Sequence, residues 1–345
     1  MFVEHLIPIG VGDLNLPNSV CVFDDGRIAV ADGGNNRIII YDQNGQELLF
    51  YGEAGFHPHN MREPIFVAVS PEQHLYISDW HNHRVLVFDK ALKFSHTLFH
   101  LGPIHKPNTL KQKSFILELF IKHLLTDKVG AQYYFDLEGL KTQKEINSKY
   151  SFKLLISGLL YYLKNLNNLK SILFNRDISV RKVNGIAFAK NRMIITQKAN
   201  RCVSAYKKEG LNLTLEQHIT HYPDGTRFGR LCNMSRGLDG RYYICDQNNH
   251  RIAILDQNLT FDDIITFKPR EGQPMAPFAC VQIAPNMLAI AVSYYIEIQN
   301  LKTGARIWQS PKMGETHGVA WDARTQTLYY VDRSNSRIER FKVDF

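Results

Sequence analysis

Cysteine is scarce in this 345-residue sequence, and none of it forms a recognisable metal or redox motif. The five cysteines are an odd number, and no two are spaced as Cys-x-x-Cys, so neither zinc binding nor thiol exchange is indicated. Strand-like apolar residues flank most of them. We expect reduced core thiols at Cys21, Cys202, Cys232, Cys245 and Cys280.

Long hydrophobic runs are also missing. The longest, Leu154 to Leu163, is too short to cross a bilayer. The first residues, Met1 to His5, lack the basic and apolar regions of a secretory signal. Apolar residues make up 44% of the chain and charged residues 21%, the balance of an ordinary globular protein. We therefore expect a cytoplasmic protein without a membrane span.

Catalytic signatures are absent as well. The sequence has no Gly-x-Ser-x-Gly elbow, no phosphate-binding glycine loop and no His-Glu-x-x-His motif. No cysteine or serine is placed convincingly for nucleophilic attack. A missing motif does not exclude an enzyme, but the sequence favours a binding protein.

What the sequence does contain is an internal repeat. Two alternating apolar runs joined by the phrase Asp-x-x-Asn-x-Arg recur four times, with the phrase beginning at Asp32, Asp79, Asp246 and Asp332. Such alternation, broken by Asp-Gly or Asn-rich turns, predicts short antiparallel strands, and a period of about 40 to 47 residues predicts one four-stranded blade per repeat. We interpret the phrase as structural, with Asp capping the turn and Arg reaching back to it.

Two degenerate copies bring the number of units to six. The first spans residues 183–201 and keeps Arg201, but has Thr196 and Ala199 where Asp and Asn are expected. The second, residues 278–292, has no polar phrase. The final unit has only three strands, while residues 1–10 form a strand without a partner. We expect residues 1–10 to complete the last blade, because this leaves no open sheet edge between the chain ends.

These phrases resemble NHL repeats, most clearly Gly55-Phe56 before Pro64 and Asp246-Gln-Asn-Asn-His-Arg-Ile252. NHL repeats occur in the tripartite-motif ubiquitin ligases, in amidating lyases and in many bacterial proteins. The resemblance implies an all-β, six-bladed β-propeller, and the residues it does not cover predict an α-helical insertion between blades 2 and 3. The expected parts are residues 1–102 (closing strand and blades 1–2), 103–181 (insertion) and 182–345 (blades 3–6).

The insertion, residues 103–181, differs in character. Thr109-Leu-Lys-Gln112 is typical of a capping box before an amphipathic helix, and a second helical pattern runs from Ser151 to Phe174. Lysine and arginine outnumber acids here. The segment is read as a solvated decoration, as a surface for a partner or for self-association, or as a nucleic-acid patch. As a crossover between blades, it should stand on the face that carries the repeated turns.

Alignment of the inner strands predicts a ring of side chains at the channel mouth, formed by Asn18, Ile65, Asn184, Asn233, Phe278 and His317. In the resembling amidating lyases this position carries zinc-binding histidines, and in gluconolactonase-type propellers Asn and acidic side chains hold calcium. Here only His317 matches the lyase pattern, and Glu63 is the nearest carboxylate in sequence. We predict no cofactor, with a calcium or zinc site at the mouth as the alternative.

Cations and aromatic residues are expected around this ring. The alignment makes Arg62, Arg181 and Arg230 equivalent, with Lys182 adjacent, and the turns add Trp80, His81, Tyr294 and Tyr295. Cations interleaved with aromatics suit phosphate attraction and base stacking, and some animal NHL propellers bind RNA on this face. The same set suits an acidic protein or a sugar phosphate.

Three functional hypotheses follow. The leading one is a non-enzymatic scaffold that engages a protein partner through the insertion-bearing face. The second is a module that binds single-stranded RNA through the basic and aromatic residues. The third is a metal-dependent lyase or lactonase acting at the channel mouth.

Overall fold

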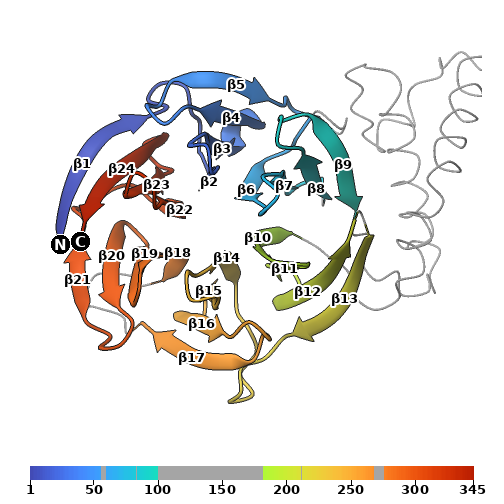
Figure 1. Cartoon of the computed structure of the whole chain (residues 1–345), viewed down its shortest axis with the longest axis vertical. Helices are drawn as coiled ribbons and strands as arrows, with labels where there is room; N and C mark the ends of the chain where they lie inside the picture. Colours follow the sequence, from blue (N-terminus) through green and yellow to red (C-terminus); the bar gives the residue numbers. More distant parts are fainter. Residues whose placement is uncertain (56–59, 83, 100–181, 211, 268–275) are drawn as a thin grey trace, which may run out of the picture.

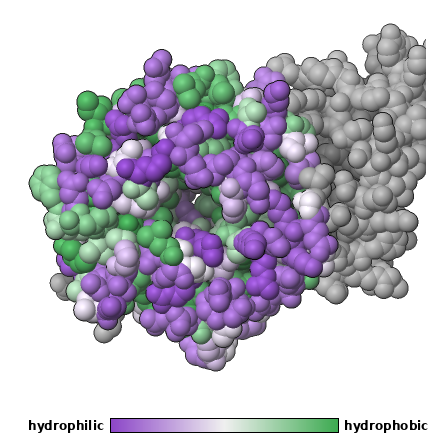
Figure 2. Space-filling view, in the orientation of Figure 1, coloured by the Kyte–Doolittle hydropathy of each residue, from purple (hydrophilic) through white to green (hydrophobic). Residues whose placement is uncertain are grey.

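A computed structural model describes residues 1–55, 60–82, 84–99, 182–210, 212–267 and 276–345. In these parts the strands form six four-stranded sheets around a central channel (Figure 1). Hydrophilic side chains surround the opening of the channel on the face drawn in Figure 2. The expected all-β, six-bladed β-propeller is confirmed. The predicted helical insertion, residues 103–181, lies outside the described residues.

Each blade is one antiparallel meander whose strands follow one another from the channel outward. Blade 1 contains β2 (Ser19–Val22), β3 (Ile28–Asp32), β4 (Arg37–Tyr41) and β5 (Glu47–Tyr51), with the 3-10 turn η1 (Gly33–Asn35) between β3 and β4. Blade 2 contains β6 (Pro64–Val69), β7 (Leu75–Asp79), β8 (Arg84–Phe88) and β9 (Phe94–Phe99). Blade 3 contains β10 (Val183–Ala189), β11 (Arg192–Gln197), β12 (Cys202–Glu209) and β13 (Asn212–Ile219).

The second half of the ring repeats this plan. Blade 4 contains β14 (Leu231–Arg236), β15 (Tyr242–Asp246), β16 (Arg251–Leu255) and β17 (Phe261–Thr266). Blade 5 contains β18 (Pro277–Ala284), β19 (Met287–Val292), β20 (Tyr295–Asn300) and β21 (Arg306–Gln309). Blade 6 contains β22 (Thr316–Asp322), β23 (Thr327–Asp332), β24 (Arg337–Asp344) and β1 (Phe2–Ile9).

The two ends of the chain share blade 6. β1 pairs antiparallel with β24, from Phe2 opposite Asp344 to Ile9 opposite Ile338, and it forms the outer strand of the sheet. The two termini consequently lie side by side in Figure 1. Because the first strand covers the last one, the ring has no open edge between its ends.

The core lies between neighbouring blades. One apolar cluster joins blades 1 and 2 and includes Ala31, Ile38, Ile77 and Leu86. Another joins blades 6 and 1. The middle strands β3, β7 and β15 are buried at every residue, because a blade packs against each of their faces.

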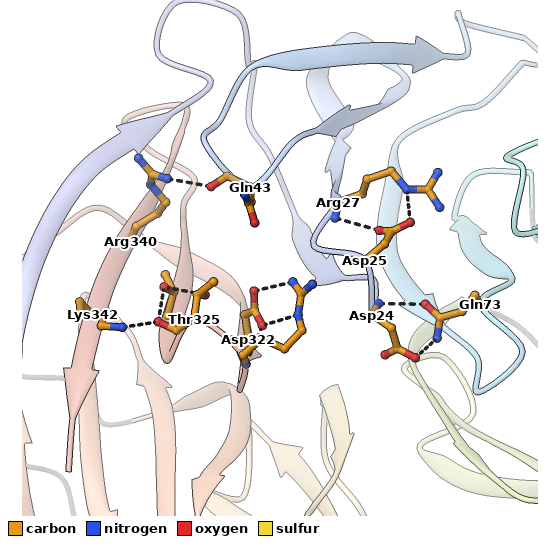
Figure 3. A network of polar contacts seen from close by, with 11 residues as sticks. Asp24, Asp25, Arg27, Gln43, Gln73, Asp322, Thr325, Arg340 and Lys342 are labelled. Carbon is orange, nitrogen blue, oxygen red and sulfur yellow. Dashed lines mark hydrogen bonds and ion pairs between the residues drawn. The ribbon is translucent and has the colours of Figure 1, made fainter.

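The meander gives the ring two different faces. The crossovers between blades and the turns between second and third strands meet on one face, which we call the crossover face. The other turns lie on the opposite face, where Figure 3 shows polar contacts that join neighbouring blades. Asp24 bonds Gln73 of blade 2, and Arg340 Nη1 donates to the Gln43 carbonyl at 3.4 Å across the closure.

The cysteines are free thiols, and four of the five are buried. Cys245 and Cys280 lie 3.5 Å apart, sulfur to sulfur, between blades 4 and 5. Burial raises the pKa of Cys202 to about 12 and that of Cys232 to about 11, which disfavours the reactive thiolate. Among the described residues, no helix is long and apolar enough to span a membrane.

Candidate site at the channel mouth

The repeated aspartate holds each crossover against the turn beside it. In blade 2, buried Asp79 accepts hydrogen bonds at one carboxylate oxygen from the Arg62 backbone N–H (2.7 Å) and at the other from Asn82 (2.7 Å) and Arg84 Nε (2.6 Å). Asp32 of blade 1 does the same with equivalent partners. The phrase is thus part of the scaffold, and it fixes the backbone that carries the side chains at the mouth.

Blades 4 and 6 vary this arrangement. Asp246 accepts from the Gly229 N–H at 2.8 Å and from the Tyr222 hydroxyl at 3.1 Å, while Arg251 pairs with Asp224 instead. In blade 6, Arg337 Nε lies 2.6 Å from Glu339 and 3.5 Å from Asp332. The aspartate and its asparagine partner are therefore more constant in role than the arginine.

The strand pairing in blade 3 corrects the sequence alignment of its repeat. Gln197 pairs with Cys202 across the turn, as Asp79 pairs with Arg84, so Gln197 and Asn200 occupy the Asp and Asn positions. The prediction of Thr196 and Ala199 there was wrong by one residue. Asn200 donates to the Gln197 amide oxygen at 2.8 Å, so a neutral amide pair replaces the charged one. Two amide residues three positions apart, Gln197 and Asn200, were the feature of the sequence that could have indicated the correct alignment.

The ring of inner-strand residues also changes at one position. Pro64, Leu231 and Thr316 pair with the signature aspartates, and the residue after each of them stands at the mouth. In β14 this residue is Cys232, because Leu231 is the residue that pairs with Asp246. Asn233, predicted for the ring, lies one residue further along and is buried. The ring is Asn18, Ile65, Asn184, Cys232, Phe278 and His317.

The same strand register shows that the arginines which the alignment made equivalent do not all occupy equivalent positions. The Arg62 N–H bonds Asp79 as the Gly229 N–H bonds Asp246, so Arg62 corresponds to Gly229. Arg230 comes one residue later, in the position of Glu63 and Lys182. The predicted equivalence of Arg62 and Arg230 is therefore wrong, and Arg181 lies outside the described residues.

The ring amides bridge neighbouring blades. Asn18 Nδ2 donates to the Pro64 carbonyl at 3.1 Å, and Asn184 Nδ2 donates to the Leu231 carbonyl at 3.2 Å. Each amide so ties its own inner strand to that of the next blade. Arg333 Nε donates to the Asn18 oxygen at 3.1 Å and brings one guanidinium to the mouth.

The carboxylates at the mouth are paired with histidines. Glu63 lies 2.7 Å from His81 Nε2, and Glu315 lies 3.5 Å from His317 Nε2. His317 also stacks on Phe278. Zinc and calcium sites need several suitable donors together, and among the described residues no group of three or more His, Cys, Asp or Glu is placed to hold a metal. The alternative of a calcium or zinc site at the mouth stays a prediction.

Three cations gather where blades 2, 3 and 4 meet the mouth. Lys182 Nζ lies 4.0 Å, and Lys198 Nζ 4.9 Å, from the centre of the Trp80 ring. Arg230 interacts electrostatically with Lys198, and its Nε is buried without a hydrogen-bond partner. The Trp80 Nε1 is buried without a partner as well. We call Lys182, Lys198 and Arg230 the basic cluster; Lys198 was missed in the sequence because its turn was misaligned.

The basic cluster lowers the pKa of one of its members, Lys198. Burial lowers the pKa of Lys198, and the charges of Arg230 and Lys182 lower it further, against the effect of Glu63. We expect the substitution Arg230→Gln to raise this pKa, because it removes a neighbouring positive charge. The measurement is the pH dependence of Lys198 acylation, followed by mass spectrometry. Lys90→Gln, on the opposite face, is the control, and an unchanged pKa in Arg230→Gln would contradict the arrangement.

The predicted aromatic residues do not form one group. Trp80 and His81 belong to blade 2, whereas Tyr294 and Tyr295 belong to blade 5, across the channel in Figure 1. Tyr294 is 39% exposed, and Lys312 Nζ lies 5.3 Å from the centre of its ring. Tyr295 is half-buried as the first residue of β20. A lysine therefore lies over each of the two most prominent rings, Trp80 and Tyr294.

Comparisons with known proteins agree with this architecture. The family model of the NHL repeat matches residues 14–41 and 61–88, which are blades 1 and 2. No curated protein matches the sequence. Among solved structures, virginiamycin B lyase from Staphylococcus aureus is similar with a TM-score of 0.57 at 11% identity, and each chain is covered to 99%. A catalytically inactive form of that lyase with quinupristin gives 0.56 at 12% identity, again with 99% coverage of each chain.

At such low identity the likeness to these lyases is one of fold alone. The repeat match and the six blades identify the architecture from two independent directions. Residues 14–41 and 61–88 match the NHL repeat, and the chain has the fold of a six-bladed β-propeller.

Proposed function

We propose that this propeller is a non-enzymatic binding scaffold that engages an acidic segment of a partner protein on its crossover face. The observation that carries the proposal is the basic cluster, Lys182, Lys198 and Arg230, at the channel mouth. Like charges held together destabilise the free protein, and an anionic partner relieves that repulsion. The positive charge of the basic cluster also attracts such a partner from a distance.

The coverage of the aromatic rings favours carboxylates over nucleic-acid bases. Base stacking needs a free ring face. Lys182 and Lys198 lie over Trp80, and Lys312 lies over Tyr294. A base stacked on the lysine-bearing face of either ring would have to displace a cation, whereas a carboxylate would bind to these cations where they stand.

We expect the full-length protein to bind a fluorescent hexaglutamate peptide and to lose that binding with the cluster. The double substitution Lys198→Gln and Arg230→Gln should weaken binding about tenfold or more, because charge-assisted hydrogen bonds contribute about 1.5 to 3 kcal/mol each. The measurement is fluorescence anisotropy at constant ionic strength. Lys90→Gln with Lys93→Gln removes the same charge from the opposite face and should change nothing. Equal losses in both double variants would refute a localised site.

RNA remains the second candidate, because the chain carries a net charge of +8 and the cluster would attract phosphates equally well. The two proposals differ in what they require of Trp80. In the RNA case oligouridine binds more tightly than a peptide of equal charge, and Trp80→Leu removes about 1 to 3 kcal/mol of binding free energy. In the acidic-protein case the peptide binds at least as well, and Trp80→Leu has a small effect.

The metal-dependent lyase or lactonase stays a prediction: among the described residues no group of three or more His, Cys, Asp or Glu supports it. The part played by residues 103–181 stays a prediction. β9 ends at Phe99 and β10 begins at Val183, so the intervening chain departs from and returns to the crossover face. Replacing residues 105–178 with a Gly-Ser linker and repeating the anisotropy measurement separates a contribution of this segment, including self-association, from that of the basic cluster.

A further inference from the structure

The backbone of Arg230 is held by hydrogen bonds, while the Nε of its side chain has no hydrogen-bond partner. The residue follows Gly229, whose N–H is held by Asp246 at 2.8 Å, and its own carbonyl accepts from the Gln247 N–H at 2.9 Å. Its backbone is thus fixed on both sides. Its Nε is nevertheless buried without a hydrogen-bond partner, a state that is rare for a donor in a folded protein.

The nearby carboxylates are engaged elsewhere. Glu63 is held by His81 at 2.7 Å, and Glu315, which interacts electrostatically with Arg230, lies beside His317 at 3.5 Å. Lys198, which is half-buried, and Lys182 face the same region and both contact Trp80. Three cations therefore converge at one place with no carboxylate in contact with Arg230 among the described residues.

We propose that Arg230, Lys198 and Lys182 form a subsite for a single phosphate group, presented by a phosphorylated side chain of the partner protein. The inference rests on the proposed function, which supplies the partner. A phosphate carries a charge of about −1.5 to −2 and three acceptor oxygens, which matches three converging cations better than one carboxylate does. A guanidinium donates two parallel hydrogen bonds to such a group, and the Arg230 Nε–H has no hydrogen-bond partner among the described residues.

Inorganic phosphate is the first probe, because it binds without a partner. We expect phosphate to raise the unfolding temperature of the full-length protein more than chloride does at equal ionic strength. Arg230→Gln should weaken phosphate binding about fivefold or more, as measured by titration calorimetry. Lys90→Gln on the opposite face should leave the binding unchanged. The proposal fails if phosphate and chloride have the same effect, or if Arg230→Gln, shown by circular dichroism to be folded, binds phosphate as the unmodified protein does.

A second experiment tests the phosphate subsite separately from the proposed scaffold function. Anisotropy with a phosphoserine peptide and its unphosphorylated form should show tighter binding of the former, with the difference lost in Arg230→Gln. If both peptides bind equally and hexaglutamate still binds, the phosphate subsite is refuted while the scaffold proposal stands. If phosphate binds but no acidic peptide does, the subsite stands and the acidic-protein partner is refuted. Tighter binding of oligouridine than of the phosphopeptide would assign the phosphate to RNA and overturn the phosphoprotein partner.

Discussion

Replacing Asp79 with alanine is expected to lower the free energy of unfolding by about 3 to 5 kcal/mol, the usual loss when one member of a buried ion pair is removed. The Asp79 carboxylate is fully buried, and the Arg84 side chain beside it is only 2% exposed. Without the carboxylate, the buried Arg84 charge loses this ion pair, and the Arg62 N–H and the Asn82 amide lose this acceptor. Urea unfolding followed by circular dichroism measures the loss.

An exposed pair of the same kind provides the control. Asp25 bonds Arg27 at 2.8 Å on the opposite face (Figure 3), and 55% of its side chain is exposed. Asp25→Ala should lower the free energy of unfolding by about 1 kcal/mol or less, because water screens the pair. Adding Arg84→Met to Asp79→Ala should recover part of the stability, since it removes a buried charge that no longer faces the Asp79 carboxylate. Equal losses for Asp79→Ala and Asp25→Ala would show that burial of the repeated phrase is not what makes it important.

Replacing Ile9 with alanine is expected to lower the free energy of unfolding by about 2 to 5 kcal/mol. Ile9 is the last residue of β1, is 4% exposed, and packs in the cluster between blades 6 and 1 with Leu14, Tyr41 and Ile338. The cavity left by alanine would lie at the closure of the ring, where the pairing of β1 with β24 joins the two ends of the chain. Thermal and urea unfolding both measure the effect.

Ile7 of the same strand is the matched control, because its side chain is 80% exposed. Ile7→Ala should change the stability by no more than about 0.5 kcal/mol. If both substitutions are nearly neutral, the closing strand contributes through its backbone pairing alone. If both are strongly destabilising, β1 is sensitive to side-chain size irrespective of burial, and the packing of Ile9 is not the reason.

The blade pattern could be predicted because it is encoded locally. Alternating apolar residues and Asp-rich or Asn-rich turns define each hairpin within a few residues, and four near-identical phrases set the period. Even the pairing of the first strand with the last follows from an incomplete final unit. The alignment of blade 3 was wrong because Gln197 and Asn200 form a neutral pair where the other blades have a charged aspartate and its asparagine partner. The repeated sequence therefore lacks its most recognisable residue in this blade.

By itself, then, the sequence determined the strands, the repeat and the six-bladed architecture, since these depend on short-range periodicity and turn chemistry. The tertiary structure alone decided which side chains meet at the channel mouth. The pairing of Leu231 with Asp246 places Cys232 rather than Asn233 in the ring, and the crossover register places Arg230 beside Lys198. The register of a strand pair is set by its hydrogen bonds, and neighbours across a ring of blades are set by how the sheets pack, not by their spacing along the chain.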